Sequence, residues 1–252
     1  MIRAAASQTL IRRIVSAPAA WTAVALIALL VLLPMSAPLF RVLFPDSPHP
    51  LYARASFLEL FLAHCLLVGV SSVIAAIVGL GAAIFVTRER GRNFLALTRA
   101  LAAIGQTFPP VAVLALSVPL IGYGMAPTLA ALVLYGILPI LEGALAGFMA
   151  VPPGVRDAAI GIGFSPWRLL TRIDLPLAFP FIVTGLRTSV VINIGTATVG
   201  ASIGALSLGS PIIEGLAAAN VAYVVQGAAV VALLAILVDQ IFGLVAERFS
   251  PH

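Results

Sequence analysis

Charged residues are scarce in this chain of 252 residues, since Asp, Glu, Lys and Arg together make up only 9% of it. Hydrophobic residues account for 62%, and the mean hydropathy is +1.15. A soluble globular domain of this composition would expose far more apolar surface than water tolerates. The composition therefore excludes a soluble domain and predicts a protein embedded in membrane lipid.

Lysine is absent and cysteine nearly so, and each absence excludes a class of site. Cys65 is the single cysteine, so the chain has no internal disulfide and no cysteine-based metal site. All fourteen basic residues are arginine, so no phosphate-binding loop ending in Gly-Lys-Ser/Thr is present. The sequence also shows no cluster of metal ligands and no nucleophile paired with a base. We therefore expect no metal site, no cofactor bound by this chain and no enzymatic activity.

Long apolar runs fill most of the chain and predict an all-α membrane protein with six transmembrane helices. About twenty apolar residues suffice for one crossing of a bilayer. Pro109 and Pro110 interrupt the third run, where we expect a kink or a break. The expected spans are residues 21–40, 57–86, 101–121, 126–150, 177–200 and 221–246.

The first run follows a tail of residues 1–18 and falls within residues 19–43. We expect it to be a retained span that is kinked near Pro34 and Pro38. A cleaved signal peptide is the competing interpretation, because Met35-Ser36-Ala37 offers small residues near a possible cleavage point.

The arginines are distributed unevenly between the two sides of this arrangement. Eleven lie on one side, against Arg41 and Arg54 on the other, while Arg187 falls inside the fifth span. The positive-inside rule places the arginine-rich side, with both termini, in the cytoplasm. Because these arginines sit in short loops between spans, the net charge of +5 indicates topology, and we expect no nucleic-acid partner. The eleven are Arg3, Arg12, Arg13, Arg88, Arg90, Arg92, Arg99, Arg156, Arg168, Arg172 and Arg248.

The longest charged interval, residues 156–176, lies between the fourth and fifth expected spans. Gly163 can adopt the left-handed conformation that ends a short helix. Ser165, which precedes a proline, is typical of the residue that caps the start of a second helix, expected over Trp167–Ile173. We expect Pro176 to end that helix.

The spacing in this interval resembles the "EAA" loop of ATP-binding-cassette (ABC) importer permeases. The order is Asp-Ala-Ala, three residues, Gly, nine residues and Ile-x-Leu-Pro, with Asp157 in place of the usual Glu. The resemblance implies the type I ABC importer permease fold over residues 57–246, with coupling helices at residues 154–174 that dock on a cytoplasmic ATPase. The residues that it assigns to ATPase coupling are Asp157, Ala158, Ala159, Gly163, Trp167, Arg168, Ile173 and Pro176.

Three further stretches, residues 120–141, 175–188 and 194–209, are similar to permeases of glycine betaine, carnitine and choline importers. That osmoprotectant branch usually carries Arg-Asn-Thr where this chain has Glu142-Gly143-Ala144. The resemblance implies a multi-pass inner-membrane subunit that receives a small solute from a periplasmic binding protein. It also implies a second permease chain, identical or different, and separate ATPase subunits that hold ATP and Mg.

Two other functions remain open at this point. One is an ABC permease for a different small solute, such as an amino acid. The other is a stand-alone secondary transporter, which usually shows internal repeats and ion sites at the midplane of the membrane. An intramembrane enzyme is disfavoured, because Asp157 and Asp174 fall outside the expected spans and have no histidine nearby.

Ionisable residues inside the expected spans need partners, because a charge at bilayer depth costs roughly 2.5 kcal/mol or more. Glu142 and Arg187 both lie about 13–15 Å from the cytoplasmic ends of their spans. Equal depth predicts a Glu142–Arg187 ion pair, with Asp239 of the sixth span as the alternative partner. Such a pair either fixes helix packing or exchanges partners during transport.

Polar residues also form a stripe in the fifth span, at Asn193, Thr196 and Thr198. They either line the solute path or hold helices together, since both roles favour small polar side chains between membrane helices.

Overall fold

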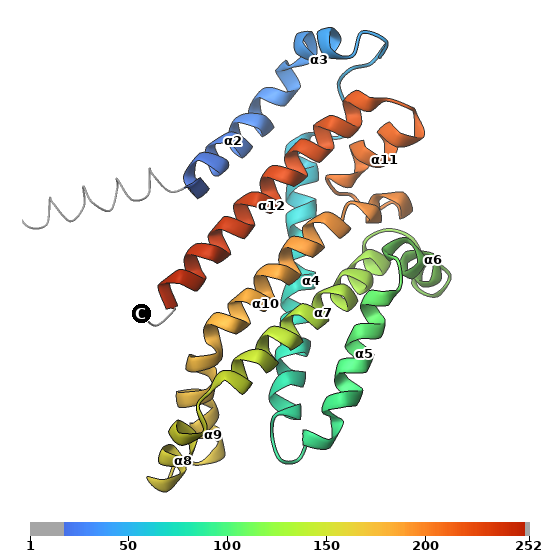
Figure 1. The fold of residues 1–252 in the computed structure, drawn as a ribbon. Coiled ribbons are helices and arrows are strands. Elements are labelled where there is room, and N and C mark those ends of the chain that lie inside the picture. The colour runs from blue at the N-terminus through green and yellow to red at the C-terminus, as the bar shows by residue number, and fades with distance from the viewer. Residues whose placement is uncertain (1–17, 250–252) are drawn as a thin grey trace, which may run out of the picture.

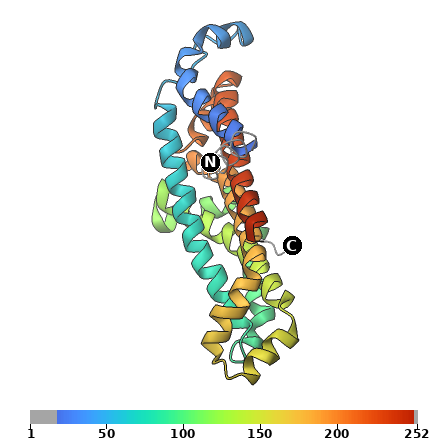
Figure 2. The ribbon, with the colours of Figure 1, turned by 90° about the vertical axis from the view of Figure 1, so that its left-hand side faces the viewer.

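The computed structural model describes residues 18–249, which form an elongated bundle of helices (Figure 1, Figure 2). Five of the described helices are long and apolar enough to cross a membrane, or six if one bent pair counts as a single span. No strand occurs in residues 18–249, so the expected all-α membrane fold is confirmed. The elements are α2 (Pro18–Leu32), η1 (Leu33–Met35), α3 (Ala37–Leu43), α4 (Phe57–Val86), η2 (Arg92–Phe94), α5 (Leu95–Thr107), α6 (Pro110–Ile121), α7 (Met125–Ala150), α8 (Pro153–Gly161), α9 (Pro166–Leu169), η3 (Leu170–Asp174), α10 (Leu175–Thr196), η4 (Val199–Ile203), α11 (Gly209–Ala217) and α12 (Val221–Phe249).

The boundaries of the long helices follow the apolar runs closely. α4 begins and ends at the expected residues, Phe57 and Val86. The hydroxyl of Ser56 fixes its start, because it accepts a hydrogen bond from the backbone N–H of Glu59 at 3.1 Å. α7 and α12 match the fourth and sixth expected spans, although α12 runs on to Phe249. The 30 residues of α4 extend about 45 Å, which exceeds the ~30 Å thickness of the hydrocarbon core.

The first span bends where the prolines predict. Pro34 lies in η1 and Pro38 in the first turn of α3, so the helix is renewed at Ala37 instead of running on. α2 packs against α12 (Figure 1). The expected tail lies outside the described residues apart from Pro18, and its three arginines lie outside them too.

The third expected span is broken at Pro109. α5 and α6 meet there at 94°, so they form either a broken span or a re-entrant loop. The break frees backbone groups, which need partners inside a membrane. The hydroxyl of Tyr135 in α7 donates to the carbonyl of Phe108, and Gln106 donates its side-chain N–H to the carbonyl of Tyr135 at 2.7 Å. α7 therefore stabilises the break.

α7 and α10 make the most extensive helix pair in the described chain, and small residues permit their close approach. A Cβ atom on Gly143 would lie 2.8 Å from the Cα of Gly185, and one on Gly147 would lie 2.8 Å from the Cβ of Ala178. We call these three glycines the glycine seam. α4 packs on α7 and α12 on α10, so the seam lies at the centre of the bundle.

Candidate functional site

Two short helices, α8 and α9, project from one end of the bundle (Figure 1, Figure 2). Gly163 separates them at φ +86°, the left-handed conformation that its position predicts. The N–H of Phe164 then bonds the carbonyl of Ala159 at 3.0 Å, which closes the end of α8. The hydroxyl of Ser165 accepts the N–H of Arg168 at 3.3 Å and caps α9 as expected. We call residues 153–169 the α8–α9 unit.

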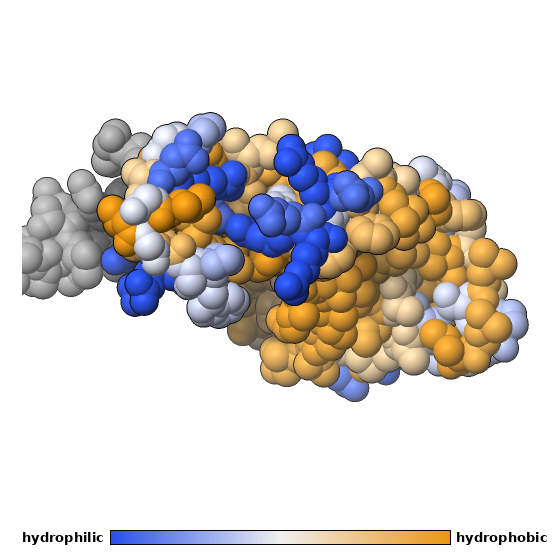
Figure 3. Space-filling view, turned by 90° about the horizontal axis from the view of Figure 1, so that it is seen from below, coloured by the Kyte–Doolittle hydropathy of each residue, from blue (hydrophilic) through white to orange (hydrophobic). Residues whose placement is uncertain are grey.

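The α8–α9 unit exposes apolar side chains at its surface. Ile160, Ile162 and Trp167 are 57%, 78% and 72% exposed. The guanidinium of Arg168 lies 5.6 Å from the centre of the Phe164 ring, a cation–π contact beside this apolar surface. Figure 3 views the molecule from this end and shows a hydrophilic patch bordered by apolar surface. A surface of this mixture fits another protein better than water or lipid.

The other residues that the "EAA" resemblance assigns divide by burial. Asp157 and Ala158 are exposed, whereas Ala159 is only 5% exposed and anchors α8 against the bundle. Ile173 is half-buried and Pro176 exposed. Most of the predicted coupling residues therefore lie on the α8–α9 unit. Ile173 and Pro176 lie beside it, in η3 and at the start of α10.

The expectation that Pro176 ends the second short helix is wrong. The helix is continuous from Pro166 to Thr196, through α9, η3 and α10. η3, which covers Leu170–Asp174, is a π-helical turn that ends two residues before Pro176. A proline normally clashes with the carbonyl four residues back. The wider π turn shifts the hydrogen-bond pattern at this point, so the helix passes the proline.

Sequence reasoning missed the role of Asp174, whose side chain is fully buried. Its Oδ2 accepts from Nη1 of Arg88 and its Oδ1 from Nε of Arg156, both at 2.8 Å. Arg88 follows α4 and Arg156 belongs to α8. The one available signal was an isolated acidic residue in an arginine-rich region, which gave no indication of burial.

The expected Glu142–Arg187 ion pair is also wrong. Arg99 of α5 pairs with Glu142 at 2.9 Å, and Arg187 pairs with Asp239 of α12, the alternative partner, at 2.5 Å. The rise of about 1.5 Å per residue gives the depth of a side chain in the membrane but not the direction in which it points around the helix. Gly143 faces α10, and each residue turns about 100°, so Glu142 points away from α10. Arg99 is therefore a helix residue with an ion-pair partner, not a free loop arginine.

The polar stripe of the fifth span is divided by the structure. Asn193 is fully buried, and its side-chain amide lies 3.5 Å from the hydroxyl of Ser71 in α4. That burial favours a role in holding α4 and α10 together. Thr196 ends α10, and Thr198 follows it with its hydroxyl bonded to the carbonyl of Gly195 at 2.7 Å. A path-lining role for these two half-buried threonines stays a prediction.

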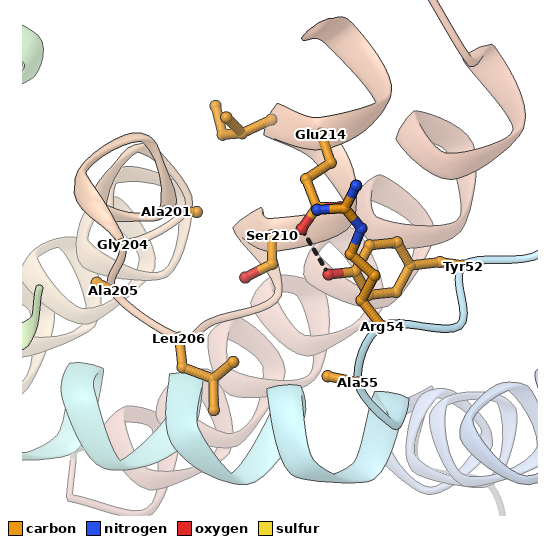
Figure 4. A pocket seen from close by; sticks show the side chains of 10 residues that line it. Tyr52, Arg54, Ala55, Ala201, Gly204, Ala205, Leu206, Ser210 and Glu214 are labelled. Atoms are coloured by element: carbon orange, nitrogen blue, oxygen red, sulfur yellow. Dashed lines mark hydrogen bonds and ion pairs between the residues drawn. The ribbon is translucent and has the colours of Figure 1, made fainter. Parts of the chain in front are cut away.

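The opposite end of the molecule has a cavity of about 260 Å³, lined by both polar and apolar residues, between the loop before α4 and α11 (Figure 4). The hydroxyl of Tyr52 donates to Oε1 of Glu214 at 2.8 Å, and Nε of Arg54 lies 3.0 Å from Oε2. Burial first, and then the hydrogen bond to the carboxylate, raises the pKa of Tyr52 above its ordinary value of 10. Among residues 18–249, no cluster of His, Cys, Asp and Glu could hold a metal ion.

The family described as "Binding-protein-dependent transport system inner membrane component" matches residues 75–251. The chain belongs to this family. It is therefore a transport permease and a multi-pass protein of the inner membrane. Family membership implies a binding protein and an ATPase as partners and favours this function over a stand-alone secondary transporter.

Curated relatives of this permease have names that specify solutes. OsmY of Salmonella typhimurium, an "Osmoprotectant import permease protein", is 36% identical over 189 residues, which is 75% of this chain and 80% of that protein. OpuCB of Bacillus subtilis, a "Glycine betaine/carnitine/choline transport system permease protein", is 36% identical over 148 residues, 59% and 68% of the two chains.

Solved structures support the same fold. The permease superposes on a chain of the inward-facing MetNI methionine ABC transporter with a TM-score of 0.68. The match covers 75% of this chain and 94% of the other at 17% sequence identity. This likeness confirms the type I ABC importer permease fold.

Proposed function

We propose that this permease conducts a small osmoprotectant of the glycine betaine, carnitine or choline type. One relative that is 36% identical is named for osmoprotectants and another for glycine betaine, carnitine and choline, and both match over most of this chain. A periplasmic binding protein would deliver the solute. A second permease chain, identical or different, would complete the path, and ATP and Mg would be held by separate ATPase subunits.

The α8–α9 unit is, in this proposal, the surface on which the ATPase docks. The observation that carries it is the exposure of Ile162 and Trp167, 78% and 72%, on the α8–α9 unit, which projects from the end of the bundle. Large apolar side chains at the interface core contribute most of the binding free energy in protein complexes. The arginine-rich end would then be cytoplasmic, and both termini would lie on that side.

The docking surface can be tested by co-purification of the ATPase with tagged permease. Trp167→Ala should reduce the amount of bound ATPase by about tenfold or more, because truncation of a buried tryptophan at an interface costs roughly 2 kcal/mol or more. Trp21→Ala is the matched control, since Trp21 is similarly exposed, at 65%, but lies on α2. Equal ATPase binding in the two variants would remove the α8–α9 unit from the interface.

The solute can be tested by uptake of radiolabelled glycine betaine, carnitine, choline and an amino acid into cells that express the complete system. Uptake of at least one trimethylammonium compound is expected, and unlabelled osmoprotectant should compete with it. Uptake of the amino acid alone would overturn the solute assignment but not the docking surface.

A further inference from the structure

Asp174 is the one buried acidic side chain among residues 18–249. Each of its oxygens accepts a hydrogen bond from a different arginine, Arg88 and Arg156, at 2.8 Å. A carboxylate at such a position requires charged partners, because removal from water destabilises it unless it is paired. The carboxylate is fully buried, whereas the side chains of Arg88 and Arg156 are 29% and 33% exposed, so the two arginines cover Asp174 from the surface.

The two arginines connect this carboxylate to separate parts of the bundle. Arg88 follows the end of α4, and its guanidinium lies 5.8 Å from the centre of the Phe148 ring. Arg156 belongs to α8 and also donates to the carbonyl of Phe148 near the end of α7, at 2.7 Å. Asp174 itself directly precedes α10. Through these two arginines, the Asp174 carboxylate connects the ends of α4 and α7 and the helix α8 with the base of α10.

The backbone around Asp174 directs the side chain into this position. The π turn of η3 ends at Asp174, and the buried residues of the turn are Leu170 and Asp174, whereas Arg172 is exposed. Single π turns inside α-helices occur frequently at functional sites. Here the turn places one acidic residue inward while the helix continues past the proline.

On the basis of the proposed docking of the ATPase, we propose that Asp174 is the positioning residue that makes the α8–α9 unit and the ends of α4, α7 and α10 move as one body. α9 runs without a break into α10, whereas the chain joins α8 to its neighbours only through Val151 and Pro152 on one side and residues 162–165 on the other. Without these ion pairs, movement of a docked ATPase would shift α8 relative to the ends of α4 and α7, because only the packing at Ala159 would then hold α8 against the bundle. Energetic coupling between distant sites travels through such packed and hydrogen-bonded contacts.

The test uses the complete importer in proteoliposomes, with its binding protein and ATPase, and measures three quantities. These are the ATPase bound per permease, the rate of ATP hydrolysis and the solute transported per ATP. Asp174→Asn should retain bound ATPase and lower the solute transported per ATP by about tenfold, a coupling loss of typical size. Glu89→Gln is the matched control, because Glu89 is an exposed carboxylate adjacent to Arg88, and it should leave all three quantities unchanged.

Asp174→Asn leaves two arginines without their carboxylate and so could prevent folding. A second variant covers that outcome. Arg156→Gln leaves the Arg88–Asp174 pair intact and removes only the link to α8 and α7. It should also lower the solute transported per ATP. Bound ATPase with unchanged coupling in Arg156→Gln would overturn the proposal. This result is distinct from failure of the proposed docking surface. If the docking surface is wrong, Trp167→Ala will retain its bound ATPase, independently of the result for Asp174→Asn.

Discussion

Gly185 offers the sharpest test of how α7 and α10 are packed. A Cβ atom at this position would lie 2.6 Å from the carbonyl oxygen of Pro139 and 3.2 Å from the Cα of Gly143. Both neighbours are backbone atoms, which cannot move aside as the end of a flexible side chain can. Gly185→Ala should therefore force the two helices apart and destabilise the protein by about 1–3 kcal/mol, the usual effect of an added methyl group in a packed core.

Gly81 in α4 provides a control at which the same substitution should not reduce stability. No atom lies within 4 Å of a Cβ built there, so Gly81→Ala adds the same methyl group without a clash. Alanine is a better helix former than glycine by up to about 1 kcal/mol. Gly81→Ala should therefore leave stability unchanged or raise it slightly.

Thermal unfolding in detergent can be followed through Cys65, because the chain has a single cysteine and it is half-buried in α4. A maleimide dye that fluoresces on reaction reports exposure of this thiol as the protein unfolds. Gly185→Ala should lower Tm by about 5 °C, since 1 kcal/mol corresponds to roughly 2–4 °C at this chain length. Equal Tm values for the two alanine variants would refute the close approach at Gly185.

Three further outcomes follow from particular contacts. Arg187→Asp and Asp239→Arg should each reduce the yield of folded protein in detergent extracts, and the double variant should restore it, because the partners are 2.5 Å apart. Tyr52→Phe should destabilise the loop at Glu214 by about 1 kcal/mol in thermal unfolding. Because the pKa of Tyr52 is raised on folding, its contribution to the free energy of unfolding is complete below about pH 10 and is lost only at higher pH. Ionisation of Tyr52 should therefore not change Tm between pH 6 and 9. Ser165→Ala should lose about 1 kcal/mol of helix capping, visible as faster amide exchange in α9.

The sequence predicted those features that depend on the order of residues along one helix. Apolar length alone located α4 to the residue, from Phe57 to Val86. Local backbone chemistry located the end of α8 and the start of α9, because the left-handed glycine and the serine cap act on residues only a few positions away. The "EAA" spacing predicted two short helices at residues 154–174. The family match covers this part of the chain, and the likeness to a solved permease confirms the fold.

Features that depend on direction around a helix could not be predicted in this way. Glu142 and Arg187 have similar depth, but the glycine seam turns one toward α5 and the other toward α12. The course of the chain at Pro176 depended on a π turn, which no single residue type signals. The burial of Asp174 depended on two arginines that are 86 and 18 residues away in the sequence.

The seam and the ion pairs hold the bundle together by different physical means. The seam fixes α7 against α10 by backbone contact, and any sliding there would lose dispersion contacts along both helices. The Arg99–Glu142 and Arg187–Asp239 pairs attach α5 and α12 to this centre through side chains that are about 40% exposed. Both pairs lie on membrane-spanning helices, where a charge that loses its partner is costly. The structure therefore combines close backbone contact between α7 and α10 at its centre with ion pairs that attach α5 and α12 to that centre, and the bundle depends on both kinds of contact.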